Sequence, residues 1–356
     1  MKILIEYAPG ASYYVRNGWR RALKACGHKV YMWLPEKMNI NDLVYELGEF
    51  DLFLGNTYTI NRAMDKWIRS NPNMKVVLFG SNWGELTDDM DSQKYPIVKV
   101  TEEEKQILGK LYNDIKKPDL VHIHITDSYL EYCMGGWRSL GIPITGILNA
   151  ADTFIYHGVQ PDPAYLSDVS IVSGYWPYKA INLDKYIVKL CNEKFFTLNI
   201  KVFGYGWNVP QYIGGLDEGK DAIAMASAKI SPTISEPHSV DFGYDVTERT
   251  FKTPVTGSLC ISDEVDLSEI FPKGVVPTFN TYKQFQELIC WYIANEDNRK
   301  SLVEQQQAII LANHTYFDRM AKVFNCLDLH KEENELLMKK TEILGLTSQK
   351  CGVIIR

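Results

Sequence analysis

The sequence contains no long apolar run, and its cysteines form no recognisable pattern. No stretch of about 18 apolar residues occurs, so we expect no membrane-spanning helix. The apolar run in MKILIEYAPG ends before Pro9 and is too short for the core of a signal peptide. Seven cysteines without a CxxC pair favour a reducing compartment over a disulfide framework or a zinc site. We therefore expect a cytoplasmic protein.

Excess positive charge is also lacking. Lys and Arg number 38 against 44 Asp and Glu, which gives a net charge of -6. A chain of this charge has no overall positive field to attract nucleic acid or anionic lipid, although a local basic groove remains compatible with it. With 46% hydrophobic and 23% charged residues, the composition is that of a folded protein. A length of 356 residues exceeds one typical core and predicts two domains.

What the sequence does contain is an alternation of apolar strands and amphipathic helices, and the alternation occurs twice. Strands are predicted at residues 2–7, 29–34, 51–55, 75–80, 119–125, 142–148, 169–174, 196–204, 229–234, 258–263 and 274–279. Helices are predicted at residues 14–27, 60–70, 101–117, 128–140, 181–193, 220–228, 281–295 and 297–327. Such an alternation favours parallel sheets that helices cover on both faces, and hence an α/β fold.

The alternation breaks at residues 149–168, where Pro, Asp and Gly are frequent and no period is visible. Such a stretch is typical of a linker between domains. We therefore expect an N-terminal domain over residues 1–155 and a C-terminal domain over residues 165–330. Residues 331–356 form a tail, for which packing against the N-terminal domain is one arrangement. Two doubly wound domains would bind a ligand in the cleft between them.

Two glycine-containing stretches of the second half follow predicted strands. In VSGYWPYKA, Gly174 can admit an anion to backbone N–H groups, and Lys179 near a helix start is favourable only beside an anion. In FGYGWN, Gly206 can admit a planar base on which Tyr205 or Trp207 stacks. Each stretch can equally be an ordinary turn, with a solvated lysine in the first and aromatic rings covering a sheet edge in the second.

The densest group of polar side chains lies in SEPHSVDFGYDVTERTFKTPVTG, which follows another predicted strand. Its charged and titratable residues are Glu236, His238, Asp241, Asp245, Glu248, Arg249 and Lys252. If a helix begins at Thr247, its first N–H groups and the guanidinium of Arg249 can hold a phosphate. Glu248 or Asp245 can accept hydrogen bonds from sugar hydroxyls. The alternative is a solvated loop with ion pairs worth about 0–1 kcal/mol each, but the concentration of polar groups between apolar strands favours a site.

Fewer candidates occur in the first half. The two-residue period of a strand places His122 and His124 on one face in PDLVHIHITD, with His124 nearer the strand end. No third ligand stands at a suitable spacing, so we do not expect a metal site. Asp152 follows the next strand and is either a site carboxylate or an N-cap. Gly10, after the first strand, either leaves room for an acceptor or forms a turn.

Four motifs of the second half resemble, in the same order, the C-terminal domain of the CgeB-like glycosyltransferases. These motifs are SIVSGYWPYKA, FGYGWN, EPHSVDFGYDVTERTFKTPVTG and HTYFDRM. The first half is similar more loosely, through GHKVYMW, PDLVHIH and Asp152. The resemblance implies the GT-B fold of the group 1 glycosyltransferases. In that fold two Rossmann-like domains face each other across a cleft, and the C-terminal one holds most of a nucleotide-sugar donor.

The resemblance also implies roles for individual residues. The implied donor-binding residues are Gly174 and Lys179 at the diphosphate, Tyr205, Gly206 and Trp207 at the nucleobase, and His238, Tyr244, Asp245 and Arg249 around the sugar and phosphates, with Tyr175 as a further donor contact. One position departs from the family, because many members carry a glutamate that holds the ribose hydroxyls where this chain has Lys252. Glu248 is a possible substitute for that glutamate.

The implied reaction is the transfer of a sugar from a nucleotide-diphosphate sugar, most plausibly a UDP-sugar, to an acceptor hydroxyl without a metal or cofactor. Lys179, Arg249 and Lys252 would neutralise the leaving diphosphate. An inverting reaction would need a base, for which Asp152 and His124 are the candidates. A retaining reaction would not need one, and the sequence leaves the stereochemical outcome open.

The acceptor stays open among a glycan, a small molecule and a modified DNA base. A DNA acceptor requires a basic stripe from Arg16, Arg20, Arg21 and Lys24, which a solvated helix face also explains. A sugar-nucleotide epimerase or hydrolase on the same fold is an alternative, since a fold does not determine a reaction. Another alternative is a protein that binds a nucleotide sugar without catalysing any reaction.

Overall fold

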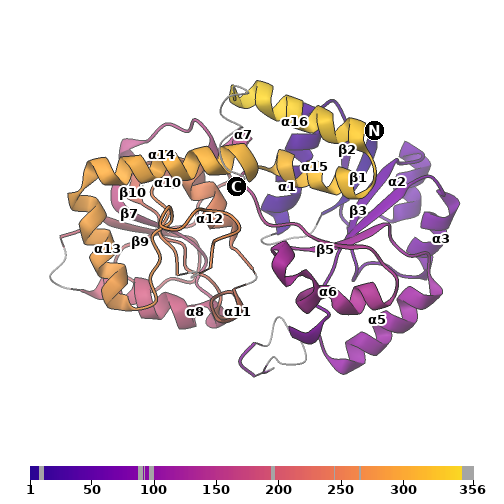
Figure 1. The fold of residues 1–356 in the computed structure, drawn as a ribbon, viewed down its shortest axis with the longest axis horizontal. Helices are drawn as coiled ribbons and strands as arrows, with labels where there is room; N and C mark the ends of the chain where they lie inside the picture. The colour runs from indigo at the N-terminus through magenta and orange to yellow at the C-terminus, as the bar shows by residue number, and fades with distance from the viewer. Residues whose placement is uncertain are drawn as a thin grey trace. The chain divides into compact units, whose positions relative to one another are not determined.

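The computed structural model describes residues 1–7, 12–86, 91, 93–95, 100–193, 197–243, 245–263 and 266–346. The chain divides into two compact units, whose elements are labelled in Figure 1. Unit 1 contains Met1–Leu148 and the C-terminal helices from Tyr316 onward, and unit 2 contains Asn149–Thr315. The chain thus returns to unit 1 before residue 331, where we expected the tail to begin.

A parallel sheet of six strands forms the centre of unit 1. Its strands are β1 (Lys2–Glu6), β2 (Lys29–Trp33), β3 (Leu52–Asn56), β4 (Lys75–Phe79), β5 (Leu120–Ile123) and β6 (Ile144–Gly146). They lie in the order β2-β1-β3-β4-β5-β6, and every pairing is parallel. Strands such as β3 (LFLGN) are apolar and buried along most of their length, because helices cover both faces of a parallel sheet. The prediction of an α/β fold with parallel sheets is confirmed.

Helices cover this sheet, with α1, α15 and α16 on one face and α3, α5 and α6 on the other (Figure 1). The helices of unit 1 are α1 (Ser12–Ala25), α2 (Ile40–Leu47), α3 (Arg62–Ser70), α5 (Glu102–Asp114), α6 (Leu130–Ser139), α15 (Tyr316–Cys326) and α16 (His330–Leu344), with a 3-10 turn η1 (Asp127–Tyr129) before α6. Helix α5, predicted over residues 101–117, has Thr101 as its N-cap, and Thr101 Oγ1 accepts a hydrogen bond from the backbone N of Glu104 at 3.2 Å. Glu104 in turn accepts from the backbone N of Thr101 at 2.7 Å, which completes a capping box.

The predicted helix over residues 297–327 is in fact two helices that belong to different units. The first ends at Asn313, and Thr315 then forms a parallel bridge with Ala151 inside unit 2. The second packs against α1, where the ring of Tyr316 lies 2.1 Å from the position that a Cβ on Gly18 would occupy. Only glycine at that position allows such close packing. Helical periodicity continues through the break, so the sequence pattern alone does not reveal it.

Unit 2 has a second parallel sheet. Its strands are β7 (Ser167–Val172), β8 (Ile200–Phe203), β9 (Tyr212–Gly214) and β10 (Ala228–Ile230), in the order β10-β7-β8-β9. Beyond β10 the sheet continues through single parallel bridges, from Ile230 to Leu259 and from Ser262 to Thr278. The strands predicted at residues 258–263 and 274–279 therefore run beside the sheet, although each pairs only at isolated residues.

The helices of unit 2 are short where they follow strands and long near the end of the unit. They are α7 (Thr153–Tyr156), α8 (Pro177–Leu183), a π-helical turn η3 (Asp184–Val188), α9 (Lys189–Asn192), α10 (Lys220–Ala226), α11 (Pro237–Phe242), α12 (Glu248–Val255), α13 (Tyr282–Ala294) and α14 (Glu296–Asn313), with a 3-10 turn η2 (Pro163–Tyr165) before β7. Helix α12 begins after Thr247, as predicted. Because the carboxyl ends of parallel strands meet at one edge, the beginnings of α8, α11 and α12 come together there.

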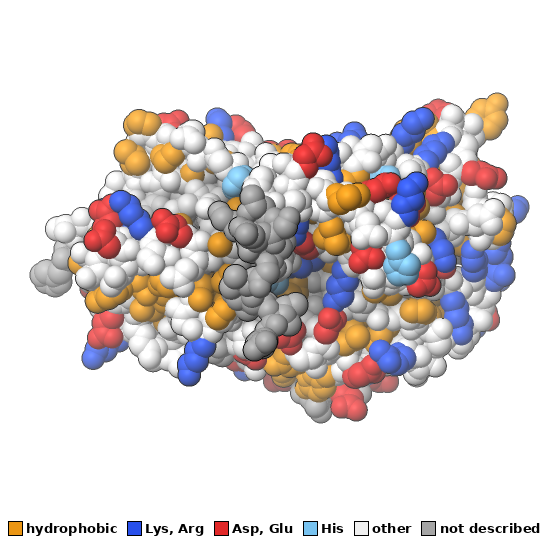
Figure 2. Space-filling model, turned by 45° about the horizontal axis from the view of Figure 1, so that its top comes forward, with side chains coloured by type: hydrophobic (Ala, Val, Ile, Leu, Met, Phe, Trp, Pro, Cys, Tyr) orange, Lys and Arg blue, Asp and Glu red, His pale blue; other side chains and the backbone are white. Residues whose placement is uncertain are grey.

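The surface carries charges of both signs. On the face drawn in Figure 2, lysine and arginine side chains are interspersed with aspartate and glutamate side chains. In the part of the chain that the structure describes, no helix is both long and apolar enough to cross a membrane.

Candidate functional site

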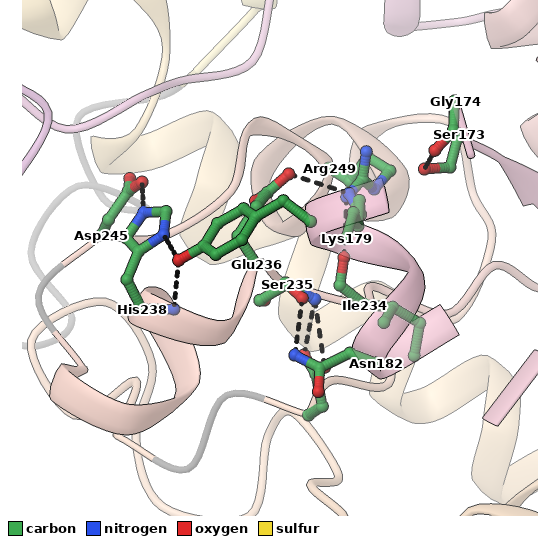
Figure 3. Close-up of polar contacts among 12 residues, drawn as sticks. Ser173, Gly174, Lys179, Asn182, Ile234, Ser235, Glu236, His238, Asp245 and Arg249 are labelled. Carbon is green, nitrogen blue, oxygen red and sulfur yellow. Dashed lines mark hydrogen bonds and ion pairs between the residues drawn. The ribbon is translucent and has the colours of Figure 1, made fainter. Parts of the chain in front are cut away.

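A group of charged side chains, two of them buried and two half-buried, lies at the carboxyl edge of the sheet in unit 2, and we call it the Lys179 cluster. It consists of Lys179 on α8, Glu236 at the N-cap of α11, Arg249 on α12 and Asp263 after the bridged segment 259–262. Lys179 Nζ lies 3.5 Å from Glu236 Oε1, and Arg249 Nη2 donates to the carbonyl oxygen of Ile234 at 2.9 Å. Figure 3 shows Lys179, Glu236 and Arg249 directed toward one another. The structure thus brings three predicted site residues together.

Burial shifts the pKa values in this cluster away from their ordinary range. Lys179 is 3% exposed, and burial, reinforced by the neighbouring Arg249 charge, lowers its pKa to about 8 despite the opposing effect of Glu236. Burial raises the pKa of Asp263 to about 6, although hydrogen bonds from Ser235 act in the opposite direction. Burial also acts to raise the pKa of Glu236, but Lys179 and Arg249 outweigh it and hold that pKa below its usual value. The lowered pKa of Lys179 therefore reflects burial and the neighbouring guanidinium, which together outweigh the two carboxylates of the cluster.

Two residues that the sequence analysis did not single out hold the cluster in place. Both carboxylate oxygens of Asp263 accept from the backbone N of Ser235 at 3.0 Å. Asn182 Nδ2 donates to the carbonyl oxygen of Ser235, also at 3.0 Å. These bonds fix the backbone on either side of Ser235, and with it the carboxylate of Glu236. Asp263 ends a predicted strand, so it could have been found as a polar residue at the carboxyl end of a strand, like its neighbours. Asn182 lies inside a predicted helix, and no sequence pattern marks it as a site residue.

A second chain of polar contacts runs through His238. The backbone N of His238 donates to Tyr178 Oη at 3.3 Å, and the same hydroxyl lies 3.0 Å from His238 Nδ1. Nε2 of the same ring lies 3.5 Å from Asp245 Oδ2. The predicted residues His238 and Asp245 therefore meet (Figure 3), and Tyr178 contacts the His238 ring on its other side.

The two glycine-containing loops contact each other, and this contact explains the glycines. The ring of Tyr205 lies 2.4 Å from where a Cβ on Gly174 would be, and Gly206 has a φ of 78° that favours glycine. Trp207 is buried and donates from Nε1 to the carbonyl oxygen of Ser173 at 2.6 Å. Trp207 thus holds the loop after β7, whereas Tyr205, with 65% of its surface exposed, remains accessible to a ligand.

Lys252 lies in a different environment, which we call the Lys252 cluster and which also contains Tyr156, Asp221 and Glu248. Its Nζ lies 3.4 Å from Asp221 Oδ2, 3.7 Å from Glu248 Oε2 and 3.2 Å from Tyr156 Oη. Tyr156 Oη donates to Asp221 Oδ2 at 2.5 Å. Two carboxylates already neutralise the ammonium. This differs from the expectation that Lys252 helps to neutralise a leaving diphosphate, and it engages Glu248 in an ion pair instead of leaving it to a ribose.

The two predicted bases lie in different units. Asp152, in unit 2, is buried and accepts a hydrogen bond from the backbone N of Phe154 at 3.1 Å, so it serves as the N-cap of α7. His124, in unit 1, is half-buried and donates from Nδ1 to the carbonyl oxygen of Ile147 at 2.8 Å. The neutral ring of His124 therefore has its hydrogen-bond acceptor on Nε2. His122 is fully buried among aromatic rings, and burial holds its pKa well below the usual value.

Two predicted site residues, Gly10 and Tyr244, lie outside the described residues. Among the residues that the structure does describe, no group of three or more His, Cys, Asp or Glu side chains is arranged to hold a metal ion.

Comparison with known proteins adds a family match and a set of similar folds. Residues 186–325 match the family model described as glycosyl transferase-like. No curated protein sequence matches the chain.

Similar solved structures cover almost the whole chain. The structure of Anabaena HepE in complex with UDP and glucose aligns with a TM-score of 0.59 and 13% identity, covering 92% of this chain and 99% of that one. AviGT4, a glycosyltransferase involved in avilamycin A biosynthesis, aligns with a TM-score of 0.51 and 11% identity, covering 95% and 98%. A Listeria monocytogenes protein proposed to be a UDP-N-acetylglucosamine 2-epimerase aligns with a TM-score of 0.51 and 9% identity, covering 99% of both chains.

Likeness at this level of identity establishes the fold, and the chain has the GT-B fold. Together, the match of residues 186–325 and this fold support a glycosyltransferase.

Proposed function

We propose that the protein transfers a sugar from a nucleoside-diphosphate sugar to an acceptor hydroxyl, and that the Lys179 cluster binds the diphosphate. The observation that carries this proposal is the state of Lys179. It is buried in the first turn of α8, next to the cation Arg249, and its pKa is lowered to about 8. The negative charge of an arriving diphosphate would offset the burial and the neighbouring guanidinium that disfavour the protonated lysine. We propose a uridine nucleotide because HepE, which shares the fold, was solved with UDP.

In this mechanism the bond between the anomeric carbon and the diphosphate oxygen breaks, and a bond from the acceptor oxygen to the anomeric carbon forms. The diphosphate leaves with the electron pair, and Lys179 and Arg249 stabilise its charge in place of water. The backbone N–H groups at the start of α12 add to this stabilisation. His238 and Asp245, held by Tyr178, would bind hydroxyls of the donor sugar.

The proton of the acceptor hydroxyl must pass to a base or to the departing phosphate. If a side chain accepts it, we place that role on His124, because its Nδ1 is engaged by Ile147 and its Nε2 is the basic nitrogen. Asp152 is the weaker candidate because its carboxylate caps α7. The exposed ring of Tyr205 would stack on the nucleobase.

Of the basic stripe that a DNA acceptor requires, Arg16 is turned inward, whereas Arg20, Arg21 and Lys24 are partly or fully exposed. Arg16, which was to begin a basic stripe on α1, is 3% exposed and donates to Asn56 Oδ1 at 2.9 Å. Its guanidinium therefore lies inside unit 1 and does not face a phosphate backbone.

A thermal-shift screen over nucleoside-diphosphate sugars, with UMP as the control, tests the proposal most simply. A ligand that binds the native state raises the melting temperature, and we expect UDP-sugars to do so more than UMP. Release of UDP is then measured with and without acceptors, in the presence of EDTA. Rapid UDP release without any acceptor would favour the hydrolase or epimerase alternative, and the lack of any shift would contradict the proposal.

A further inference from the structure

Helix α12, which carries Arg249, is held by the stretch that the sequence analysis interpreted as a linker. The chain enters unit 2 at Asn149 and soon reaches α7. Contacts from this entry segment, residues 149–156, reach α12 before its start and along its length. The proposed mechanism uses only one residue of the segment, Asp152, as the weaker candidate base.

Asn149 fixes the backbone where the chain enters α12. Its Nδ2 donates a hydrogen bond to the carbonyl oxygen of Val246 at 3.0 Å, and the two residues are only 9% and 2% exposed. Val246 directly precedes Thr247, the N-cap of α12. A carbonyl before the N-cap accepts no hydrogen bond from its own helix, so a buried one needs a partner from elsewhere in the fold. Asn149 supplies that partner.

Val246 lies between two parts of the proposed donor site. The residue before it, Asp245, contacts the ring of His238, and Arg249 follows three residues later in the first turn of α12. Arg249 Nη2 donates to the carbonyl oxygen of Ile234 at 2.9 Å, which directs the guanidinium toward the Lys179 cluster. A displacement of the backbone at Val246 would therefore change the position of this guanidinium.

Further contacts tie the body of α12 to the same entry segment. Tyr156 Oη lies 3.2 Å from Lys252 Nζ in the Lys252 cluster. The backbone N of Ala151 donates to the carbonyl oxygen of His314 at 2.9 Å, and the rings of His314 and Phe251 pack with centroids 5.7 Å apart. These contacts hold the body of the helix, whereas the buried amide sets its first turn. We therefore expect α12 to stay folded without the amide, with its first turn displaced.

We propose that Asn149 is a positioning residue of the donor site, which sets the first turn of α12 and with it the guanidinium of Arg249. The inference rests on the proposed function, in which Arg249 stabilises the departing diphosphate. Rates are sensitive to such placement, because a displacement of about 1 Å in a charged group at the reacting centre costs about 100-fold. The entry segment thus contributes to the reaction and does more than join the two units.

Steady-state kinetics of the full-length protein, with the UDP-sugar identified by the thermal-shift screen, test this role. Asn149→Ala should lower kcat about tenfold to 100-fold and reduce the preference for UDP over UMP in calorimetric titration. Asn71→Ala is the matched control, because Asn71 Nδ2 donates to the carbonyl oxygen of Trp67 at 2.8 Å and the residue is 6% exposed at the end of α3. Both variants lose a buried amide-to-carbonyl bond, so the control reports the effect of lost stability alone.

A double-variant cycle separates positioning from a general loss of structure. In an Arg249→Ala background, Asn149→Ala should lower kcat by no more than about twofold, because the group that it positions is already gone. The same fold-change in both backgrounds would overturn the inference. An effect of Asn149→Ala on kcat no larger than that of Asn71→Ala would overturn it as well.

Asn149→Asp answers the same question if the alanine variant does not fold. The ionised carboxylate has the shape of the amide but no N–H group, so kcat at pH 8 should be about tenfold below the wild type. The ratio to the wild type should rise toward pH 5.5, where a protonated carboxyl donates to the Val246 carbonyl, and a ratio near one at pH 8 would overturn the inference. If the wild type binds no nucleoside diphosphate, the proposed function itself fails. If it binds and turns over the donor while the Asn149 variants match the control, only the positioning role fails.

Discussion

Helix α12 carries two cations three residues apart, and their surroundings have opposite character. Arg249 reaches the Lys179 cluster, where two cations stand with Glu236 and with Asp263, whose pKa is raised to about 6. Lys252 reaches the Lys252 cluster, where one cation stands with two carboxylates. The two clusters therefore differ in how many cations share two carboxylates: Lys179 and Arg249 share theirs, whereas Lys252 alone has two, so the first cluster has more capacity to bind an added anion.

The same contrast separates the sheet edges of the two units. The edge of unit 2 gathers Lys179 and Arg249 with carboxylates, whereas the edge of unit 1 gathers tyrosines and turns Arg16 inward. The same topology therefore places side chains of different chemistry at equivalent positions of the two sheets, because both groups follow the carboxyl ends of strands.

Among substitutions that test the difference between the Lys179 cluster and the Lys252 cluster, we expect the largest effect from Lys252→Met. Removing this cation leaves the buried carboxylate of Asp221 and the half-buried one of Glu248 without their ion pair, which should lower the free energy of unfolding by about 3–5 kcal/mol. Urea denaturation measures the change, and adding Asp221→Asn should restore part of the loss. In the folded protein, the affinity for UDP should stay close to that of the wild type. A stable Lys252→Met variant that no longer binds UDP would place Lys252 at the donor instead.

Arg249→Ala should act on the reaction rather than on stability. If Arg249 stabilises the departing diphosphate, its loss should lower the rate of transfer about 100-fold. Initial rates of UDP release at saturating donor measure this. Lys220→Ala is the control, because this lysine is half-exposed and forms only a local ion pair with Asp217. A rate within about twofold of the wild type in both variants would contradict the role of Arg249.

The affinity for UDP should depend on pH through Lys179. This group is protonated below its pKa of about 8, and a bound diphosphate stabilises the protonated form. Affinity should therefore fall by about fivefold to tenfold between pH 8 and pH 9, as the free protein loses the proton and binding must restore it. Calorimetric titration at several pH values measures the slope.

The variant Lys179→Met, combined with Glu236→Gln to avoid an unpaired buried charge, should bind more weakly and show no such slope. The cluster contains no other group that titrates in this window, because Glu236 has a lowered pKa, Asp263 has one of about 6, and Arg249 is a guanidinium. An unchanged slope in the double variant would assign the pH dependence to a different group.

The smallest effect is expected from Asp152→Asn. Asparagine caps a helix about as well as aspartate, so stability should change by less than about 0.5 kcal/mol if Asp152 only begins α7. Helix α7 also carries Tyr156, which belongs to the Lys252 cluster. By capping α7, Asp152 therefore helps to hold the Lys252 cluster in place. A loss of transfer of about 100-fold or more without a change in stability would instead identify Asp152 as the base.

The sequence predicted the sheets better than it predicted the partners of single side chains. Apolar runs separated by amphipathic helices predict parallel strands, and polar residues after those strands predicted that Lys179, Glu236 and Arg249 belong to a site, which the structure brings together. The pairing of Lys252 could not be predicted, because Asp221 and Tyr156 come from helices α10 and α7, distant in sequence.

The break between α14 and α15 could not be predicted for a related reason. It depends on the bridge between Thr315 and Ala151 and on the packing of Tyr316 against Gly18, which are tertiary contacts. The residues on both sides of the break favour a helix, and this helix propensity carries no information about either tertiary contact.

The central claim is that the Lys179 cluster binds a nucleoside diphosphate through its second phosphate, and calorimetric titration of UDP and UMP tests it most directly. Charged hydrogen bonds of this kind contribute about 1.5–3 kcal/mol, so UDP should bind the wild type at least about tenfold more tightly than UMP. In Arg249→Ala that preference should largely disappear, while the affinity for UMP changes little. Equal affinities for UDP and UMP in the wild type, or a preference that Arg249→Ala leaves intact, would contradict the account.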